Sequence, residues 1–241
     1  MRTFDVIVVG LGGIGSAAAC HLASRGQRVL GLDRFPIAHD KGSSHGQTRL
    51  IRLAYFEHPD YVPLLQRAYE LWRDLEARTG RRLLVESGLV MAGPGDGTVI
   101  TGALTSAATH GLELERLSAR EACRRWPVFA LPESWAVVHE RRAGYLFVEA
   151  CVAAHAEAAQ QAGATLETGV RVHGWRADGA GVVVSTDRGV KIAEHSGGHV
   201  VAAFSGHGFK FASVMGSALA DLATTGSTSL PIGFLSPRRF C

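Results

Sequence analysis

The stretch that most constrains the fold lies near the start of the chain. The apolar, β-branched run FDVIVVG predicts a buried parallel strand. It leads into GLGGIG, in which Gly10, Gly12 and Gly15 have the G-x-G-x-x-G spacing. The helix-forming run SAAACHLASRG closes at Gly26, and RVLGLD predicts a second strand that ends in Asp33. Strand, glycine turn, helix, strand and acid together predict a dinucleotide-binding βαβ unit.

Each part of this unit has a physical purpose. Gly10 permits a tight turn, and Gly12 lets the backbone approach a pyrophosphate. Gly15 permits close packing of the helix, whose N-terminus offers N–H groups to phosphate. Asp33 lies at the distance where an acid accepts ribose hydroxyls. The alternative is a glycine-rich turn without a ligand, and the motif alone does not choose between FAD and NAD.

The segment GSSHGQTRLIR, residues 42–52, follows the second predicted strand. Its small polar residues can donate hydrogen bonds to phosphate. Arg49 and Arg52 are three residues apart, so on a helix they would share a face, and an Arg can clamp a carboxylate with two hydrogen bonds. The alternative is a surface turn with solvated Arg side chains.

Composition excludes several classes of partner. The 241 residues carry 25 Lys and Arg against 22 Asp and Glu, an excess too small to indicate nucleic-acid binding. The four Cys form no C-x-x-C motif, so neither a zinc site nor a redox pair is expected, and this usage suits the cytoplasm. The apolar N-terminal run is broken by glycines, which argues against a signal peptide or a membrane span.

The middle of the chain predicts further helices and strands. HPDYVPLLQRAYELWRDLEARTG has an amphipathic helical pattern that ends at Gly80. Its predicted core positions are Leu64, Leu65, Ala68, Leu71, Trp72 and Leu75. We expect a strand pair in LLVESGLVMAG, helices in ITGALTSAATHG and SAREACRRWP, and a strand followed by a helix in GYLFVEACVAAHAEAAQQAGA. The alternating residues of TLETGVRVHGWRADGAGVVVSTDRG predict hairpin strands with turns at ADGAG and TDRG.

Four segments together resemble the monomeric sarcosine oxidase and N-methyltryptophan oxidase family of FAD-dependent amine oxidases. They are the N-terminal unit, GSSHGQTRLIRLAY, YVPLLQRAYELWRDLE and FSGHGFKF. The resemblance implies an α/β fold: a Rossmann-like FAD-binding domain with a parallel sheet and helices, plus a reduced mixed-sheet substrate domain. The expected limits are 1–80, 148–188 and 199–241 for the FAD-binding domain, and 81–147 and 189–198 for the remnant of the substrate domain.

The same resemblance implies an activity. It predicts an oxidase that removes a hydride equivalent from the secondary amine of an amino acid, of the sarcosine or N-methyltryptophan type, and produces hydrogen peroxide. The expected partners are FAD, a small amino-acid substrate and oxygen, and the protein is expected to be a cytoplasmic monomer. FAD should be non-covalent, because Cys20, Cys123 and Cys151 do not match the residue that links the flavin in the family.

Site residues follow from the resemblance position by position. The cofactor-binding residues implied are Gly10, Gly12, Gly13, Ile14, Gly15, Asp33, Arg34, Ser43, Ser44, Thr48, Val172, Gly206 and Gly208. The catalytic residues implied are Lys191, His195, Arg49 and His45. Arg52 and Lys210 are implied to bind the substrate carboxylate.

The segments GVKIAEHSGG and SGHGFKF are not adjacent in full-length members of that family. Their closeness here indicates two internal deletions, near Gly189 and Gly198. The alternative needs one deletion: GVKIAEHSGGHVVAA is then an ordinary edge strand and Lys191 a chance match. Three functions therefore remain open: the oxidase, a catalytically inactive FAD-binding remnant, and an NAD-dependent dehydrogenase, against which SGHGFKF argues.

Overall fold

The computed structural model describes residues 3–179, 181–194 and 208–236. The chain forms two compact units. The first comprises Met1–Arg49, Ala68–Leu83 and Phe147–Leu230, and the second comprises Leu50–Arg67, Leu84–Leu146 and Pro231–Cys241. Helices and strands occur in both, and the first holds a parallel sheet with helices, so the predicted α/β class is confirmed.

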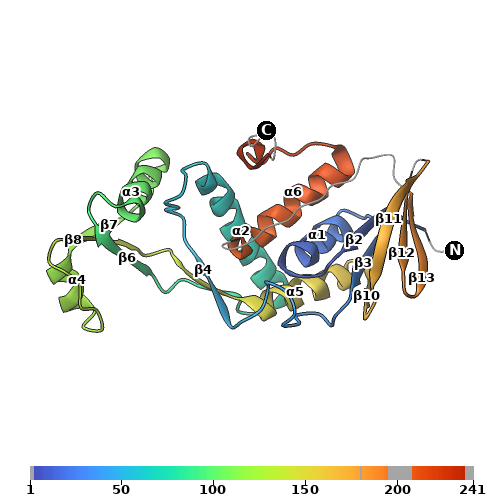
Figure 1. Cartoon of the computed structure of the whole chain (residues 1–241), viewed down its shortest axis with the longest axis horizontal. Helices are drawn as coiled ribbons and strands as arrows, with labels where there is room; N and C mark the ends of the chain where they lie inside the picture. Colours follow the sequence, from blue (N-terminus) through green and yellow to red (C-terminus); the bar gives the residue numbers. More distant parts are fainter. Residues whose placement is uncertain (1–2, 180, 195–207, 237–241) are drawn as a thin grey trace. The chain divides into compact units, whose positions relative to one another are not determined.

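The first unit is built on a parallel sheet with the strand order β10-β3-β2. Its strands are β2 (Val6–Val9), β3 (Val29–Asp33) and β10 (Thr165–Thr168). The predicted βαβ unit is confirmed, because α1 (Gly13–Ser24) connects the parallel strands β2 and β3. α1 packs against α5 (Val148–Gln161) and α6 (Ala212–Thr225), as Figure 1 shows.

A second sheet of this unit has the order β1-β13-β12-β11. Its strands are β1 (Thr3–Phe4), β11 (Val172–Asp178), β12 (Gly181–Thr186) and β13 (Gly189–Glu194). The predicted hairpin between β11 and β12 is confirmed, and so is the turn at TDRG, where Thr186 pairs with Gly189 between β12 and β13.

The single strand predicted for FDVIVVG is divided in two. The carboxylate of Asp5 accepts hydrogen bonds from the backbone N–H and the Nε–H of Arg28, at 2.7 and 2.9 Å. β1 before this residue pairs in parallel with β13, whereas β2 after it pairs with β3. The residues do form β-strands as predicted, but the prediction of one continuous strand is wrong.

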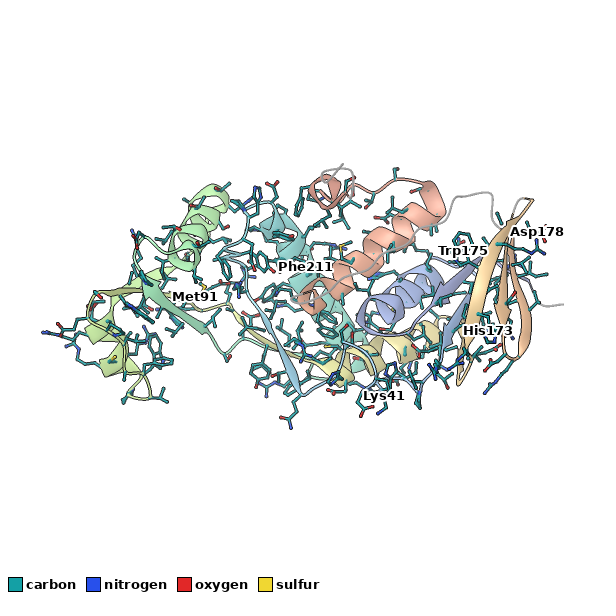
Figure 2. All side chains as sticks on the ribbon, in the orientation of Figure 1. Lys41, Met91, His173, Trp175, Asp178 and Phe211 are labelled. Carbon is teal, nitrogen blue, oxygen red and sulfur yellow. The ribbon has the colours of Figure 1, made fainter. Side chains whose placement is uncertain are left out.

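No pattern noted in the sequence predicts the helix α6 or the short 3-10 helix η1 (Phe209–Phe211) before it. Phe211, labelled in Figure 2, is buried where η1 meets α6. α6 lies very close to α1: a Cβ added to Gly216 would be 2.5 Å from the Cβ of Ala17. Small residues on both helices make this approach possible.

The second unit contains an antiparallel sheet with the order β6-β8-β7. Its strands are β6 (Leu89–Pro94), β7 (Glu115–Ser118) and β8 (Trp135–Glu140). The strand pair expected in LLVESGLVMAG is wrong, because β5 (Leu84–Val85) pairs with β9 (Gly144–Phe147) and β6 pairs with β8. β4 (Thr48–Ile51) extends the β9-β5 pair to a sheet with the order β4-β9-β5.

The helices predicted in the middle of the chain are confirmed. They are α2 (Tyr61–Thr79), α3 (Thr98–His110) and α4 (Ala119–Arg125). All six predicted core positions of α2 are buried. In the second unit, Met91, labelled in Figure 2, packs with Ala54, Ile100 and Val138. A 3-10 helix, η2, spans Gly233–Leu235. Of the helices in the described ranges, none is long and apolar enough to cross a membrane.

His155 on α5 is a buried polar group in the core of the first unit. Its side chain is 2% exposed, and its ring centroid lies 5.1 Å from that of Trp72 and 6.4 Å from that of His21. Its Nδ1 has no hydrogen-bond partner. Burial lowers the pKa of His155 to about 3, with smaller contributions from His21 and Arg78.

We predict that His155→Phe reduces the sensitivity of the fold to acid. The pKa of His155 is lower in the folded than in the unfolded state. Its contribution to the free energy of unfolding is therefore fully present above about pH 6.5 and is lost as pH falls towards 3. At pH 5 the loss attributable to this residue should be about 2 kcal/mol. Denaturant unfolding at pH 7.5 and pH 5 measures the loss in the free energy of unfolding for the parent and the variant. An equal loss in parent and variant would contradict this assignment.

Candidate dinucleotide-binding site

The glycine fingerprint forms a tight turn between β2 and α1. Gly10 has φ +90°, a left-handed conformation that favours glycine. Its N–H donates to the carbonyl of Leu32 at 2.8 Å. A Cβ added to Gly15 would lie 1.8 Å from the carbonyl oxygen of Gly10. Two of the three fingerprint glycines are therefore required by the turn itself.

Asp33, the acid at the end of β3, is buried against this turn. One carboxylate oxygen accepts the N–H of Leu11 at 2.7 Å, and the other accepts the N–H of Phe35 at 2.8 Å. The Nε2 of His39 lies 3.6 Å from the second oxygen. A carboxylate has about four acceptor positions. The two backbone bonds therefore leave Asp33 capacity to accept further hydroxyl groups.

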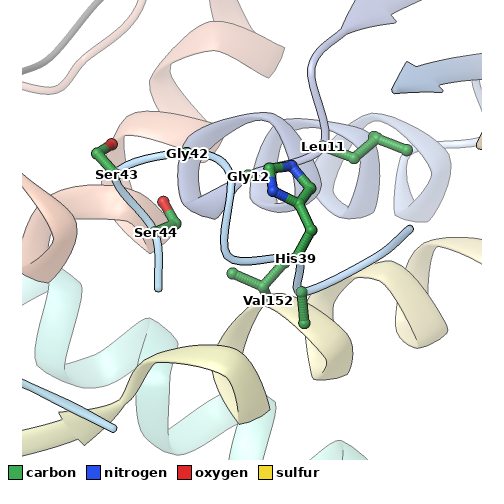
Figure 3. Close-up of a pocket in the computed structure, with 8 residues that line it drawn as sticks. Leu11, Gly12, His39, Gly42, Ser43, Ser44 and Val152 are labelled. Atoms are coloured by element: carbon green, nitrogen blue, oxygen red, sulfur yellow. The ribbon is translucent and has the colours of Figure 1, made fainter. Parts of the chain in front are cut away.

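A cavity of about 210 Å³ lies beside the turn (Figure 3). Its lining residues are Leu11, Gly12, Ala38, His39, Gly42, Ser43, Ser44 and Val152. Three of them, Gly12, Ser43 and Ser44, were predicted as cofactor-binding from the sequence. The structure thus brings together the fingerprint and the polar loop that follows the second strand.

The N-terminus of α1 also faces this loop. Gly12 precedes the helix and provides no side-chain cap, and the N–H of Gly13 donates to the Oγ of Ser44 at 3.0 Å. A Cβ added to Gly13 would lie 2.8 Å from the ring of Phe209. The segment SGHGFKF therefore returns to the fingerprint at Phe209, which directly follows Gly208. First-turn N–H groups beside a cavity are suited to a phosphate.

These features fit a bound dinucleotide. Gly12 leaves the cavity wall without a side chain, the helix N-terminus favours an anion, and Asp33 provides a buried acceptor. We expect these residues to hold the cofactor.

Sequence reasoning missed part of the cavity wall. His39 faces Asp33, Ala38 has an unusual φ of +59°, and Val152 comes from α5. Figure 3 shows the ring of His39 beside Gly12 and Leu11. A signal for His39 exists, because the loop after the second strand of such a unit must pass the acid that ends this strand. Val152 lies in a helical apolar pattern and gives no local signal.

Arg49 does not share a helix face with Arg52, because Thr48–Ile51 forms β4 instead of a helix. In the first unit, the guanidinium of Arg49 donates to the carbonyls of Thr48 and His45 at 2.8 and 2.6 Å, and more weakly to Ser43 at 3.4 Å. These bonds hold the loop that lines the cavity. His45 itself is exposed.

Arg52 belongs to the second unit, where its side chain is 14% exposed. Its guanidinium lies over the rings of Tyr55 and Phe56, with centroid distances of 5.0 and 4.7 Å. One terminal nitrogen is 3.5 Å from a carboxylate oxygen of Glu57, and the buried Nε has no hydrogen-bond partner. Such a group can accept a further anionic ligand.

Lys210 belongs to the first unit and is 4% exposed. Its carbonyl accepts the indole N–H of Trp72 at 3.1 Å, and its Nζ lies 5.5 Å from the centroid of the Phe211 ring. Burying an amino group costs free energy, so the fold around η1 must compensate for the burial of the Lys210 side chain.

The remaining predicted residues lie in different surroundings. Lys191 is on β13, and its Nζ lies 2.9 Å from a carboxylate oxygen of Glu167 on β10. Val172 is opposite Thr186 in the second sheet, and the exposed Arg34 lies over the ring of Phe35. Ile14 lies in the first turn of α1, and Thr48 begins β4. His195 and Gly206 lie outside the described residues.

The fold and this site define an α/β dinucleotide-binding protein. A family model described as FAD dependent oxidoreductase (DAO) matches residues 5–195. The chain belongs to this family of FAD-dependent oxidoreductases.

Its relatives include named oxidases. The chain is 46% identical over 183 residues to monomeric sarcosine oxidase of Streptomyces avermitilis, covering 71% of this chain and 48% of the relative. It is 37% identical over 183 residues to N-methyl-L-tryptophan oxidase of Yersinia pestis, covering 76% and 49%. The chain thus spans about half the length of these relatives, 48% and 49%.

Solved structures agree on the fold. NikD, an unusual amino acid oxidase essential for nikkomycin biosynthesis, superposes with a TM-score of 0.73 at 35% identity, over 80% of this chain and 50% of NikD. L-proline dehydrogenase from P. horikoshii gives a TM-score of 0.85 at 17% identity, over 99% and 98% of the two chains, which supports the fold alone.

We predict that Gly12→Val abolishes cofactor retention without unfolding the protein. A Cβ added at Gly12 meets its nearest atom, the Oγ of Ser44, at 3.5 Å, an ordinary contact, so its branches would enter the cavity instead. Gly15→Ala is the matched control. Its Cβ would clash with the turn, so this variant should lose the cofactor and also have a lower unfolding temperature. Desalting after incubation with FAD measures retention. Equal flavin content in parent and Gly12→Val would refute the prediction.

Proposed function

We propose that this chain has the activity of an FAD-dependent oxidase acting on the secondary amine of an amino acid, of the sarcosine or N-methyltryptophan type. The single observation that carries the proposal is the cavity formed jointly by the fingerprint and the GSSHG loop, in a chain of this family. The named activities of its relatives, sarcosine and N-methyl-L-tryptophan oxidation, support this class of substrate.

The residues proposed to hold FAD are those around this cavity. Asp33 would accept sugar hydroxyls, and Gly12, Gly13 and Ser44 would surround the pyrophosphate. Bound FAD would supply the two-electron oxidation of the C–N bond, with oxygen as the final acceptor and hydrogen peroxide as the product. The protein would orient the amine and exclude water.

We propose that FAD is held without a covalent bond. Cys20 and Cys151 are buried in helices α1 and α5, and Cys123 is half-buried in α4. Burial raises the pKa of both the Cys20 and the Cys151 thiols, which makes them poor nucleophiles. Cys241 lies outside the described residues.

Arg52 is proposed to bind the substrate carboxylate, because it is a mostly buried cation whose Nε has no hydrogen-bond partner. The same role is proposed for the buried Lys210 on family resemblance alone. A charge-assisted hydrogen bond is strong where water is excluded. Arg49 and His45 are proposed to act at the flavin from the loop beside the cavity. His195 remains a proposal on family resemblance alone.

For Lys191 we propose a structural role, because β13 pairs with both β12 and β1 as an ordinary hairpin strand. β13 is therefore an inner strand of its sheet, whereas the alternative with one deletion expects an edge strand at Lys191. Its ion pair with Glu167 would join the two sheets of the first unit.

We predict that Lys210→Met and Arg52→Lys each weaken the binding of methylthioacetate to FAD-loaded protein. Losing a hydrogen bond to a charged group should cost roughly 1.5–3 kcal/mol for Lys210→Met. Arg52→Lys removes the two-pronged geometry. Titration followed by the visible flavin spectrum measures both. Unchanged affinity in both variants would contradict the proposed carboxylate site.

A second candidate function is a catalytically inactive FAD-binding remnant. It is favoured by one observation: the segments GVKIAEHSGG and SGHGFKF, which are not adjacent in full-length members of the family, lie close together in this sequence. A peroxide assay of FAD-loaded protein with sarcosine and N-methyltryptophan separates the two. We predict peroxide from at least one substrate, and a tightly flavin-loaded sample that forms none from either would favour the remnant.

A further inference from the structure

Glu140, the last residue of β8, is a buried carboxylate in the second unit. Its side chain is 3% exposed. One oxygen accepts the N–H of Leu53 at 2.6 Å, and the other accepts the N–H of Ala54 at 3.0 Å. A buried carboxylate is costly unless hydrogen bonds compensate it. Both of these hydrogen bonds come from backbone N–H groups of a single short segment.

That segment, Arg52–Glu57, is here called the arginine segment. It is also held from α3 of the same unit. The Oγ of Ser106 donates to the carbonyl of Tyr55 at 2.5 Å. A Cβ added to Gly102 would lie 2.1 Å from the carbonyl oxygen of Phe56, so the backbone packs directly on the helix. The segment is therefore fixed at both its start and its middle.

The position of the Arg52 guanidinium depends on this backbone. Tyr55 and Phe56 lie against it, and Glu57 approaches one of its terminal nitrogens. All three contacts come from residues just beyond the two N–H groups that Glu140 binds. If these groups moved, the aromatic rings and the guanidinium would lose their alignment.

We propose that Glu140 is a positioning residue, which fixes the arginine segment so that Arg52 can bind the carboxylate of the substrate. The inference rests on the proposed carboxylate-binding role of Arg52. It assigns to Glu140 no contact with the substrate. Glu140 acts through the backbone of Leu53 and Ala54, and Ser106 and Gly102 provide the opposing support.

The test is Glu140→Gln, which keeps the shape of the side chain but removes its charge and one of its two acceptor oxygens. Glu121→Gln is the matched control, because Glu121 accepts a backbone N–H, that of Ser118, elsewhere in the same unit. Amide hydrogen exchange of Leu53 and Ala54 in the ligand-free chain reports the anchoring. Calorimetric titration of the FAD-loaded chain with methylthioacetate reports carboxylate binding.

We expect exchange at Leu53 and Ala54 to accelerate in Glu140→Gln only, and its affinity for methylthioacetate to fall about ten-fold. Glu121→Gln should bind like the parent. Glu140→Asp keeps the charge but is one methylene shorter, so it should also bind methylthioacetate more weakly. It replaces Glu140→Gln in the test if that variant does not fold.

Two results would overturn the inference in distinguishable ways. If Arg52→Lys weakens binding but Glu140→Gln and Glu140→Asp bind like the parent, Glu140 has no positioning role and the carboxylate site stands. If the parent itself does not bind methylthioacetate, or if Arg52→Lys binds as well as the parent, the proposed site fails and the inference fails with it.

Discussion

The first unit depends on one interaction above all, the hydrogen bond from the Leu11 N–H to the carboxylate of Asp33. It joins the turn after β2 to the end of β3 at a buried position. The other oxygen of Asp33 binds the N–H of Phe35, so the same carboxylate directs the chain out of β3 into the loop that forms the cavity wall. A buried carboxylate with backbone donors is stable only where such donors converge.

Local patterns were sufficient to predict the βαβ unit of β2, α1 and β3. The alternation of an apolar run, glycines and a small-residue helix follows from short-range packing, and each element was found where it was expected. The division at Asp5 was not predictable from the apolar pattern, because its cause is a bond to Arg28, 23 residues away. The helix α6 was not predicted, because its small residues show no clear apolar stripe. Its place is set by close contact of Gly216 with α1.

Residues that position others were the hardest to find. Glu140 ends β8, a strand that was not predicted from the sequence, and its partners are 87 and 86 residues earlier in the chain. Burial raises its pKa despite these two bonds, which shows that desolvation is the larger effect. Arg52, by contrast, was proposed as a site residue by resemblance, although the strand β4 before it was not predicted.

We propose above all that the cavity beside Asp33 and Gly12 holds FAD. The most direct measurement is incubation of the chain with FAD or NAD, desalting, and spectroscopic determination of the bound cofactor, followed by acid precipitation. We expect one FAD per chain, all released into the supernatant by acid, and no retained NAD. Absence of retained FAD, or retention of NAD in its place, would contradict it.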